Sequence, residues 1–134
     1  GDQYGYINSS GAYVWSYEKK ADIITGTKAN DNFEIASPSI RFKTKEIFNM
    51  VINNYYKPWN ISKIEMRLSE INQVGVAQPY SINTISIDPN GSKFGIISNN
   101  ITAGQFFQYK TGKIELSLIS DNKLIAKTQV EIIK

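Results

Sequence analysis

Aromatic side chains crowd one short segment of this sequence and offer the first chemistry that could bind a ligand. Tyr55, Tyr56 and Trp59 lie close together, and Pro58 and Asn60 flank the tryptophan. Proline interrupts strand pairing, so Trp59 is expected in a loop outside the regular ladder. Flat aromatic rings present large apolar faces on which a sugar ring can stack. The segment therefore predicts a ligand-binding patch made of Tyr55, Tyr56 and Trp59.

Aromatic residues also have a purely structural explanation. They favour strands, and they remove a large apolar area from water when they pack. Tyr13, Trp15 and Tyr17 alternate along the chain, so in a strand they would all project from one face. Under this alternative the rings fill a core or cover a sheet edge, and they bind nothing.

Two polar turns carry oxygen atoms that could hold calcium. Asp88 and Asn90 stand beside Gly91, and residues 30–32 read Asn-Asp-Asn. Calcium prefers carboxylate and carbonyl oxygens, but neither segment has the longer acidic spacing of a helical calcium loop. Asp and Asn also form turns by bonding their own backbone without any metal. We therefore expect turns here and no metal site.

Paired carboxylates could hydrolyse glycosides, which makes the positions of the acids important. The candidates are Glu65, Glu70, Glu115 and Glu131. A catalytic acid needs a shielded carboxyl group with a raised pKa. Glu65, Glu115 and Glu131 occupy outward positions of alternating segments, where nothing in the sequence predicts such shielding. A small carboxylate hydrolase is the least favoured function.

Histidine and cysteine are both absent from the 134 residues. No Ser-His or Cys-His pair can form, and neither imidazole nor thiolate is present to bind zinc. We therefore expect no catalytic residue and no cofactor. The net charge is only +3, and the arginines are Arg41 and Arg67. Without a basic stripe, nucleic-acid binding is not expected.

The expected location is outside the cytoplasm of a bacterium. No run of apolar residues approaches the ~20 needed for a membrane helix, so no membrane span is expected. The chain begins at Gly1 without an export signal, which is consistent with a signal removed upstream. Isoleucine, asparagine and lysine are abundant, a bias associated with AT-rich bacterial genomes. We expect a secreted or cell-surface protein.

The carboxy-terminal third has the clearest strand pattern. Ile114, Leu116 and Leu118 alternate with polar residues, residues 120–122 form a turn cluster, and residues 123–133 alternate again. Period two is the period of a strand, and Ser-Asp-Asn is suited to a tight turn. The pattern predicts a hairpin with one face inward and the other face in water.

Shorter strand signals fill the rest of the chain. Residues 46–54 are apolar on both faces, which is typical of a central strand. The other expected strands are residues 22–27, 39–43, 63–68, 82–87 and 93–98, and a turn is expected at Asp88–Gly91. Residues 101–109 are expected to form either one strand bent at Gly104 or a loop followed by a strand from Gln105. About seven to nine strands separated by turns predict an all-β sandwich of two antiparallel sheets, as one domain over residues 1–134.

The pattern of strands resembles a known family. Gly104–Tyr109 followed by Gly112–Ser120 and Lys123–Ile133 resembles the last strands of an immunoglobulin-like bacterial domain. Phe48–Asn54 followed by Trp59–Leu68 similarly resembles an inner pair of that sandwich. The resemblance implies an immunoglobulin-like β-sandwich, here without the cysteine pair of antibody domains. The chain is also similar to small exported Bacillus proteins of unknown function, which implies export but no activity and no site residues.

These observations predict a non-catalytic exported domain with a binding or accessory role, whose partner is a cell-wall polymer, a glycan or a protein. A carbohydrate-binding module would show exposed aromatic rings on one face or in one loop cluster. A protein-interaction or adhesion subunit would show a contiguous apolar patch or an unpaired, uncharged edge strand. A hydrolase would show a cleft with two converging carboxylates.

Overall fold

The computed structural model describes residues 19–54, 61–88, 90–91 and 93–134, together with the backbone of three two-residue strands near the amino terminus. Those strands are β1 (Tyr6–Ile7), β2 (Tyr13–Val14) and β3 (Ser16–Tyr17). The other elements are β4 (Ala21–Gly26), β5 (Arg41–Lys43), β6 (Asn49–Asn54), β7 (Lys63–Ile71), β8 (Ala77–Ser86), β9 (Lys93–Ile96), α1 (Ala103–Phe106), β10 (Gly112–Ser120) and β11 (Lys123–Ile133).

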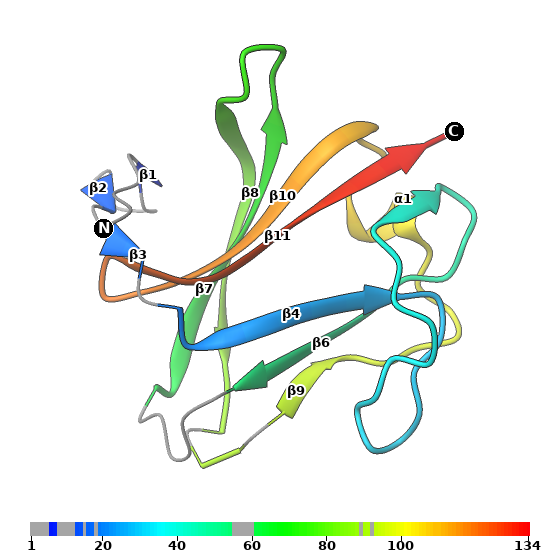
Figure 1. Ribbon diagram of the computed structural model, residues 1–134, viewed down its shortest axis with the longest axis horizontal. Coiled ribbons are helices and arrows are strands. Elements are labelled where there is room, and N and C mark those ends of the chain that lie inside the picture. The colour runs from blue at the N-terminus through cyan, green and yellow to red at the C-terminus, as the bar shows by residue number, and fades with distance from the viewer. Residues whose placement is uncertain are drawn as a thin grey trace.

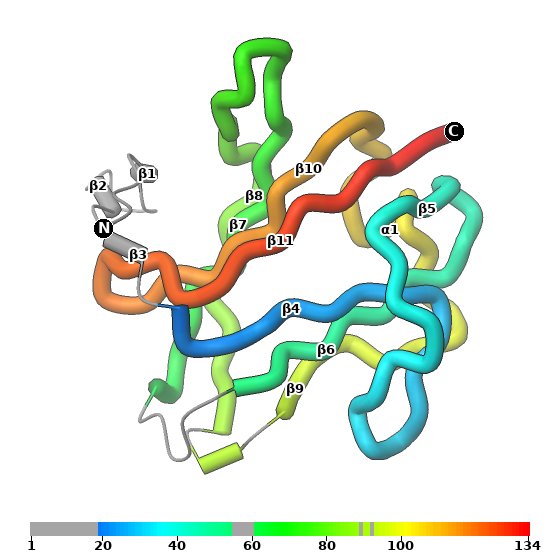
Figure 2. Tube along the Cα trace, in the orientation of Figure 1, coloured from blue at the N-terminus to red at the C-terminus, as the bar shows by residue number. Residues whose placement is uncertain are grey.

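Two sheets stack as the layers of a sandwich (Figures 1 and 2). The larger sheet has the order β3-β11-β10-β7-β8, and β5 pairs with the end of β11. The smaller sheet has the order β4-β6-β9, while β1 and β2 form a separate pair. Pairing is antiparallel except that β3 and β5 run parallel to β11. The predicted all-β sandwich of two largely antiparallel sheets is confirmed.

The hairpin of β10 and β11 forms where the sequence predicts it. Asp121 and Asn122 have φ angles of 50° and 62°, and Ser120 pairs with Lys123 on either side of them. Two consecutive residues with positive φ match the right-handed twist of the flanking strands. Asp and Asn tolerate this conformation because their short polar side chains bond locally. The turn chemistry therefore fixes the register of the hairpin.

The core lies between the two sheets. β6 is buried along most of its length and lies between β4 and β9, which confirms the predicted central strand, although it begins at Asn49 and not at residue 46. Each Leu, Ile or Phe removed from water stabilises the fold by roughly 1.5–3 kcal/mol. The buried apolar cluster includes Ile23, Phe42, Phe48, Met50, Ile52, Ile64, Leu68, Phe107, Ile114, Leu116, Leu118, Ile125, Val130 and Ile132.

The outward face of the larger sheet is not wet where β7 and β10 meet, so that part of the prediction is wrong. Arg67, Ser69 and Ser117 have no exposed surface, and Glu115 is only 7% exposed. In the ladder Ser117 lies opposite Arg67, and Glu115 lies opposite Ser69. Period two tells which residues share a face. It does not tell whether that face meets solvent.

Residues 103–109 form a helical turn, which corrects both versions of the predicted strand. Thr102 Oγ1 accepts a hydrogen bond from the Gln105 N–H, and the Gln105 side chain accepts one from the Thr102 N–H. This is a capping box, which satisfies backbone donors at the start of α1. Gln108 and Tyr109 then adopt φ angles of 57° and 61°. Thr-x-x-Gln is a local signal for the start of a helix, and here it prevails over the strand preference of the aromatic residues that follow.

The predicted turn at Asp88–Gly91 is present, but it does not close a hairpin. The Gly91 N–H donates to the Asp88 carbonyl at 3.0 Å. β8, before the turn, pairs with β7, whereas β9, after it, pairs with β6. The turn therefore carries the chain from the larger sheet to the smaller one and leaves β8 as a terminal strand.

Candidate functional site

The predicted aromatic patch lies outside the described residues. Nothing in the structure tests whether Tyr55, Tyr56 and Trp59 form a binding surface. The same holds for Trp15, and β2 and β3 are described as backbone only. The carbohydrate-binding alternative therefore stays a prediction.

The two polar turns use their side-chain oxygens to hold the backbone. Asn30 Oδ1 accepts hydrogen bonds from the N–H groups of Asn32 and Glu34 at 2.9 and 3.1 Å. Asp88 Oδ1 accepts one from the Asn90 N–H at 2.9 Å. These are local turns of the kind that Asp and Asn form without a metal. Among the described residues no group of three acidic side chains is placed to hold a metal ion.

The four candidate acids are each paired with a cation. The ion pairs, with their N–O distances, are Glu65–Arg67 at 2.8 Å, Glu70–Lys110 at 3.4 Å, Glu115–Lys127 at 4.0 Å and Glu131–Arg41 at 2.9 Å. Glycoside hydrolysis instead needs one acid and one base facing a common sugar. The carboxylates act here as partners of basic side chains.

Arg67 is the residue whose environment the sequence did not indicate. Its side chain is fully buried, and Nη2 contacts Glu65 Oε2. Within the described residues, Nε and Nη1 of Arg67 and the hydroxyls of Ser69 and Ser117 are buried without a hydrogen-bond partner. A buried polar cluster of this kind, with several groups unpaired, carries a large desolvation cost. Because Arg67 has no exposed surface, it is not displayed as a phosphate-binding fork on the surface.

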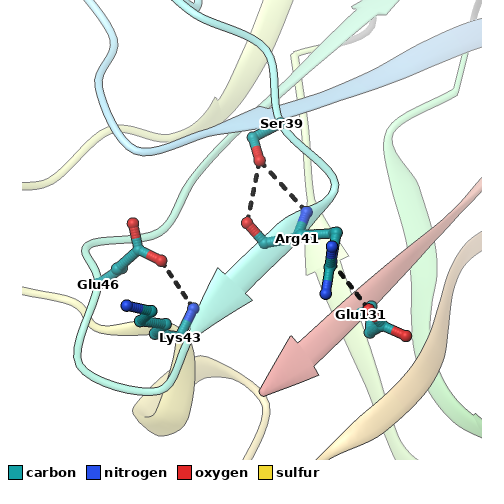
Figure 3. A network of polar contacts seen from close by, with 5 residues as sticks. All are labelled: Ser39, Arg41, Lys43, Glu46 and Glu131. Atoms are coloured by element: carbon teal, nitrogen blue, oxygen red, sulfur yellow. Dashed lines mark hydrogen bonds and ion pairs between the residues drawn. The ribbon is translucent and has the colours of Figure 1, made fainter. Parts of the chain in front are cut away.

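One end of the larger sheet protects its own edge (Figure 3). The Glu131 N–H donates to the Ile40 carbonyl, and the pairing of β5 with β11 continues from there. The N–H groups of Arg41 and Lys43 point the other way, since directions alternate along a strand. Ser39 Oγ accepts from the Arg41 N–H at 3.2 Å, and Glu46 Oε1 accepts from the Lys43 N–H at 2.8 Å. Side chains therefore occupy the outward donors of β5.

The opposite end of the sheet is β8, and its register shows which main-chain groups face outward. The Ile87 N–H donates to the Ser62 carbonyl at 2.9 Å, so these two residues form a hydrogen-bonded pair of the antiparallel ladder. Such pairs recur at every second residue, so odd-numbered residues of β8 bond to β7 between 81 and 87. The N–H and C=O groups of Ile82, Thr84 and Ser86 therefore point away from β7.

β8 carries few of the features that protect an edge. None of its ten residues is charged. Pro79 and an irregular register opposite Leu68–Ser69 restrict pairing only at its first few residues, which leaves Tyr80–Ser86 regular. Within the described part of the chain, no strand pairs with the outer edge of β8, and no side chain bonds to the outward groups of Ile82 or Thr84. Natural edges usually bear charges, prolines or bulges.

The hairpin that contains β8 also stands clear of the sandwich (Figure 1). At its tip Val74 is 81% exposed, and Val76 is 53% exposed. Ile82, on the free strand, is 39% exposed. Exposed apolar side chains therefore lie at the tip of this hairpin and, at Ile82, on the strand with the free edge.

Contacts from the segment after α1 fix one end of this edge. The Tyr80 hydroxyl donates to the Phe107 carbonyl at 3.1 Å, and Gln108 Nε2 donates to Ser81 Oγ at 3.0 Å. Lys110 Nζ lies 5.7 Å from the centre of the Tyr80 ring. Burial, and secondarily the Glu70 carboxylate, raise the pKa of the Tyr80 hydroxyl well above the ordinary tyrosine value. Tyr80 thus stays neutral and donates its hydrogen bond across the physiological range.

Comparison with solved structures agrees with this architecture. The chain is similar to an immunoglobulin-like protein from Pseudomonas aeruginosa, with a TM-score of 0.58 and 11% identity over 87% of this chain and 95% of that one. The fold is immunoglobulin-like. A mutant β-glucosidase from Listeria innocua also matches, with a TM-score of 0.38 and 11% identity over all of this chain and 20% of the enzyme; this likeness is too weak to support an argument.

The remaining comparisons give no family. No family model matches the chain, and no curated protein matches it. None of the helices among the described residues is long and apolar enough to cross a membrane. The immunoglobulin-like fold assigns no ligand, because unrelated functions share such folds. Function must be argued from the surface of the molecule.

Proposed function

We propose that this chain is a non-catalytic interaction domain of an exported bacterial protein, and that it binds an extended polypeptide segment along the free edge of β8. The observation that carries the proposal is the outward row of main-chain groups at Ile82, Thr84 and Ser86. In strand addition such groups supply the affinity, and alternate side chains supply the specificity. Tyr80–Ser86 spans about 24 Å at ~3.4 Å per residue. The partner segment is therefore about seven residues long.

The chemistry of the partner follows from the strand. β8 has no charge to attract or repel a charged peptide, and exposed valines lie near its start. An uncharged partner segment rich in β-branched residues suits such an edge, because β-branched side chains pack well on a pleated surface. Among the function classes predicted from the sequence, this is the protein-interaction or adhesion subunit.

Export and a position at the cell surface belong to the same proposal. The support is the composition and the resemblance to small exported Bacillus proteins. Fractionation of the source bacterium with an antibody to this chain tests it. Detection in the medium or the cell-wall fraction is expected, and detection confined to the cytoplasm would contradict it.

The edge itself is tested with a backbone substitution. Thr84→Pro removes an N–H group that faces away from β7, so the ladder within the domain keeps its bonds. Thr84→Ala is the matched control, since it keeps that N–H and also shortens the side chain. Peptides of seven to ten residues are selected from a displayed random library on the unmodified domain, and each is then measured against both variants. We expect binding to survive Thr84→Ala and to weaken at least tenfold with Thr84→Pro.

The position of the bound peptide is read from amide exchange. The amides of Ile82, Thr84 and Ser86 should exchange slowly only in the complex. Selected peptides that bind both variants equally, or a library that yields none, would overturn the proposal. A dimer of the purified domain in sedimentation that disappears with Thr84→Pro would also overturn it as stated, because the occupant would then be a second copy.

A further inference from the structure

The smaller sheet carries a separate feature on its outer face. A pocket of about 200 Å³ opens between that face and the loop of residues 27–38. Its lining combines apolar side chains with a polar rim and comes from β4, β6, β9 and the loop. The lining residues are Ile24, Phe33, Glu34, Ile35, Pro38, Val51, Asn53 and Lys93.

The floor of the pocket is apolar because of strand register. Ile24 lies directly opposite Val51, and their neighbours Ile23 and Ile52 point into the core. Ile24 and Val51 therefore share the outer face. Val51 is only 2% exposed although it lies outside the core cluster. The loop must therefore shield it from water.

The loop closes over this floor because Gly26 has no side chain. A Cβ atom at Gly26 would lie 2.5 Å from Ile35 Cγ2 and 2.9 Å from the Ser37 carbonyl oxygen. The backbone of Gly26 also bridges to Pro38. Ile35 can therefore pack directly onto the strand and form a wall of the pocket.

A second wall is built from a strained residue. Phe33 has a φ angle of 58°, which is a rare conformation for a bulky side chain. Its N–H donates to the Asn30 carbonyl at 3.1 Å, and the Asn30 side chain accepts from the N–H of Glu34. These bonds offset the strain and hold the Phe33 ring against the pocket. Strain maintained in this way is concentrated at binding sites.

The rim is polar at one end. Lys93 lies opposite Asn53 in the ladder, so both side chains stand together on the outer face. Glu34 Oε1 accepts a hydrogen bond from Asn30 Nδ2 at 3.0 Å. Within the described residues no ion pair involves Lys93. An ammonium group and an amide therefore flank the mouth of an apolar pocket, and the Glu34 carboxylate, which accepts from Asn30, lines the pocket as well.

We propose that this pocket binds a small carboxylate with a compact apolar body, with the apolar part on Ile24 and Val51 and the carboxylate at Lys93 and Asn53. The volume is below the roughly 300 Å³ of pockets that hold drug-sized ligands, so one ring or one branched chain fits. A free organic acid and the carboxy-terminal residue of a polypeptide present the same chemistry. The site is independent of the β8 edge.

The test compares an acid with its amide. 3-Phenylpropionate and 3-phenylpropanamide are titrated into the labelled protein, and amide shifts are followed by NMR. We expect saturable shifts around Ile24, Ile35 and Val51, with the acid bound about two- to fivefold more tightly, the range that one exposed ion pair provides. Lys93→Met should remove the preference, whereas Lys63→Met, an exposed lysine on the other sheet, should keep it.

Two further arms complete the experiment. A peptide ending in phenylalanine is compared with its carboxy-terminal amide. Saturation by the free-acid peptide alone would assign the site to a polypeptide terminus. Saturation by phenylpropionate would assign it to a free acid. Equal binding of each acid and its amide, or shifts that saturate with neither phenylpropionate nor the free-acid peptide, would overturn the proposal. Thr84→Pro should leave all these titrations unchanged.

Discussion

The two ends of the larger sheet are built in opposite ways. β5 has three residues, and the N–H groups of Arg41 and Lys43 that face away from β11 are capped by Ser39 and Glu46. β8 has ten residues without a charge, and its outward groups have no cap among the described residues. Short, charged or capped edges prevent unwanted strand pairing. The chain uses that protection at β5, whereas in β8 Pro79 and the irregular register protect only the first few residues. The unprotected part, Tyr80–Ser86, is where we propose the function.

The arginines at the two ends also differ, one being buried and the other exposed. Substituting them should give the largest difference in stability between the two ends. Arg67, opposite Ile82 of β8, is buried, whereas the side chain of Arg41 on β5 is 67% exposed. Arg67→Ala removes a fully buried side chain together with its ion pair to Glu65 and should lower the free energy of unfolding by about 3–5 kcal/mol. Arg41→Ala breaks an exposed pair and should cost less than about 1 kcal/mol. Urea unfolding measures both. Equal costs would remove the contrast between the two ends.

Proline substitutions on β8 compare the stability cost of losing an N–H group that bonds to β7 with the cost of losing one that points away from it. Asn83→Pro deletes an N–H that bonds to β7 and leaves the Met66 carbonyl unpaired, which should cost about 1–3 kcal/mol. Thr84→Pro deletes an outward N–H and should cost less than about 1 kcal/mol. Thermal unfolding of the two variants gives the difference. If Thr84→Pro were the more harmful substitution, the outward direction of residue 84 would be wrong.

Tyr80 links the β8 edge to the segment after α1. The stability that this contact contributes should decrease at alkaline pH. Tyr80→Phe deletes the bond to the Phe107 carbonyl and should cost about 1 kcal/mol at pH 8. The folded-state pKa of Tyr80 is raised, so above pH 10 the unfolded chain releases this proton first, and the stability contributed by Tyr80 falls as pH rises. The gap between the unmodified protein and Tyr80→Phe should therefore narrow between pH 8 and pH 11. Urea unfolding across this range measures it, and a gap that widens would contradict the assignment.

Removing the protection of β5 should have the smallest effect. Ser39→Ala deletes the exposed acceptor of the Arg41 N–H and should lower stability by about 0.5 kcal/mol. Faster exchange of the Arg41 amide, with the Lys43 amide unchanged, is the measurement. Unchanged exchange at Arg41 would show that Ser39 does not protect this edge.

Several elements could be predicted from local sequence because local chemistry decides them. The alternation around Ile114 and Leu118 and the turn at Asp121–Asn122 specify a hairpin whatever lies around it. The Thr102–Gln105 capping box is equally local, and it indicates the helical turn that replaces the strand predicted within residues 101–109. The candidate sites were harder to predict. The edge at β8 depends on which strand the turn after it leads to, and the pocket depends on residues from four separate segments.

The amino-acid sequence alone determined that this chain is all-β, that the apolar segment containing β6 (Asn49–Asn54) is a central strand, and that no histidine or cysteine chemistry is available to it. These properties follow from composition and period, which need no knowledge of neighbours. Only the tertiary structure decided that β8 is a terminal strand with a free edge, that Arg67 is buried on an outward-facing position, and that a loop encloses a pocket over Val51. The reason is physical: an alternating pattern assigns a side chain to a face, whereas sheet order and covering segments decide whether that face or edge meets water, another strand or a ligand.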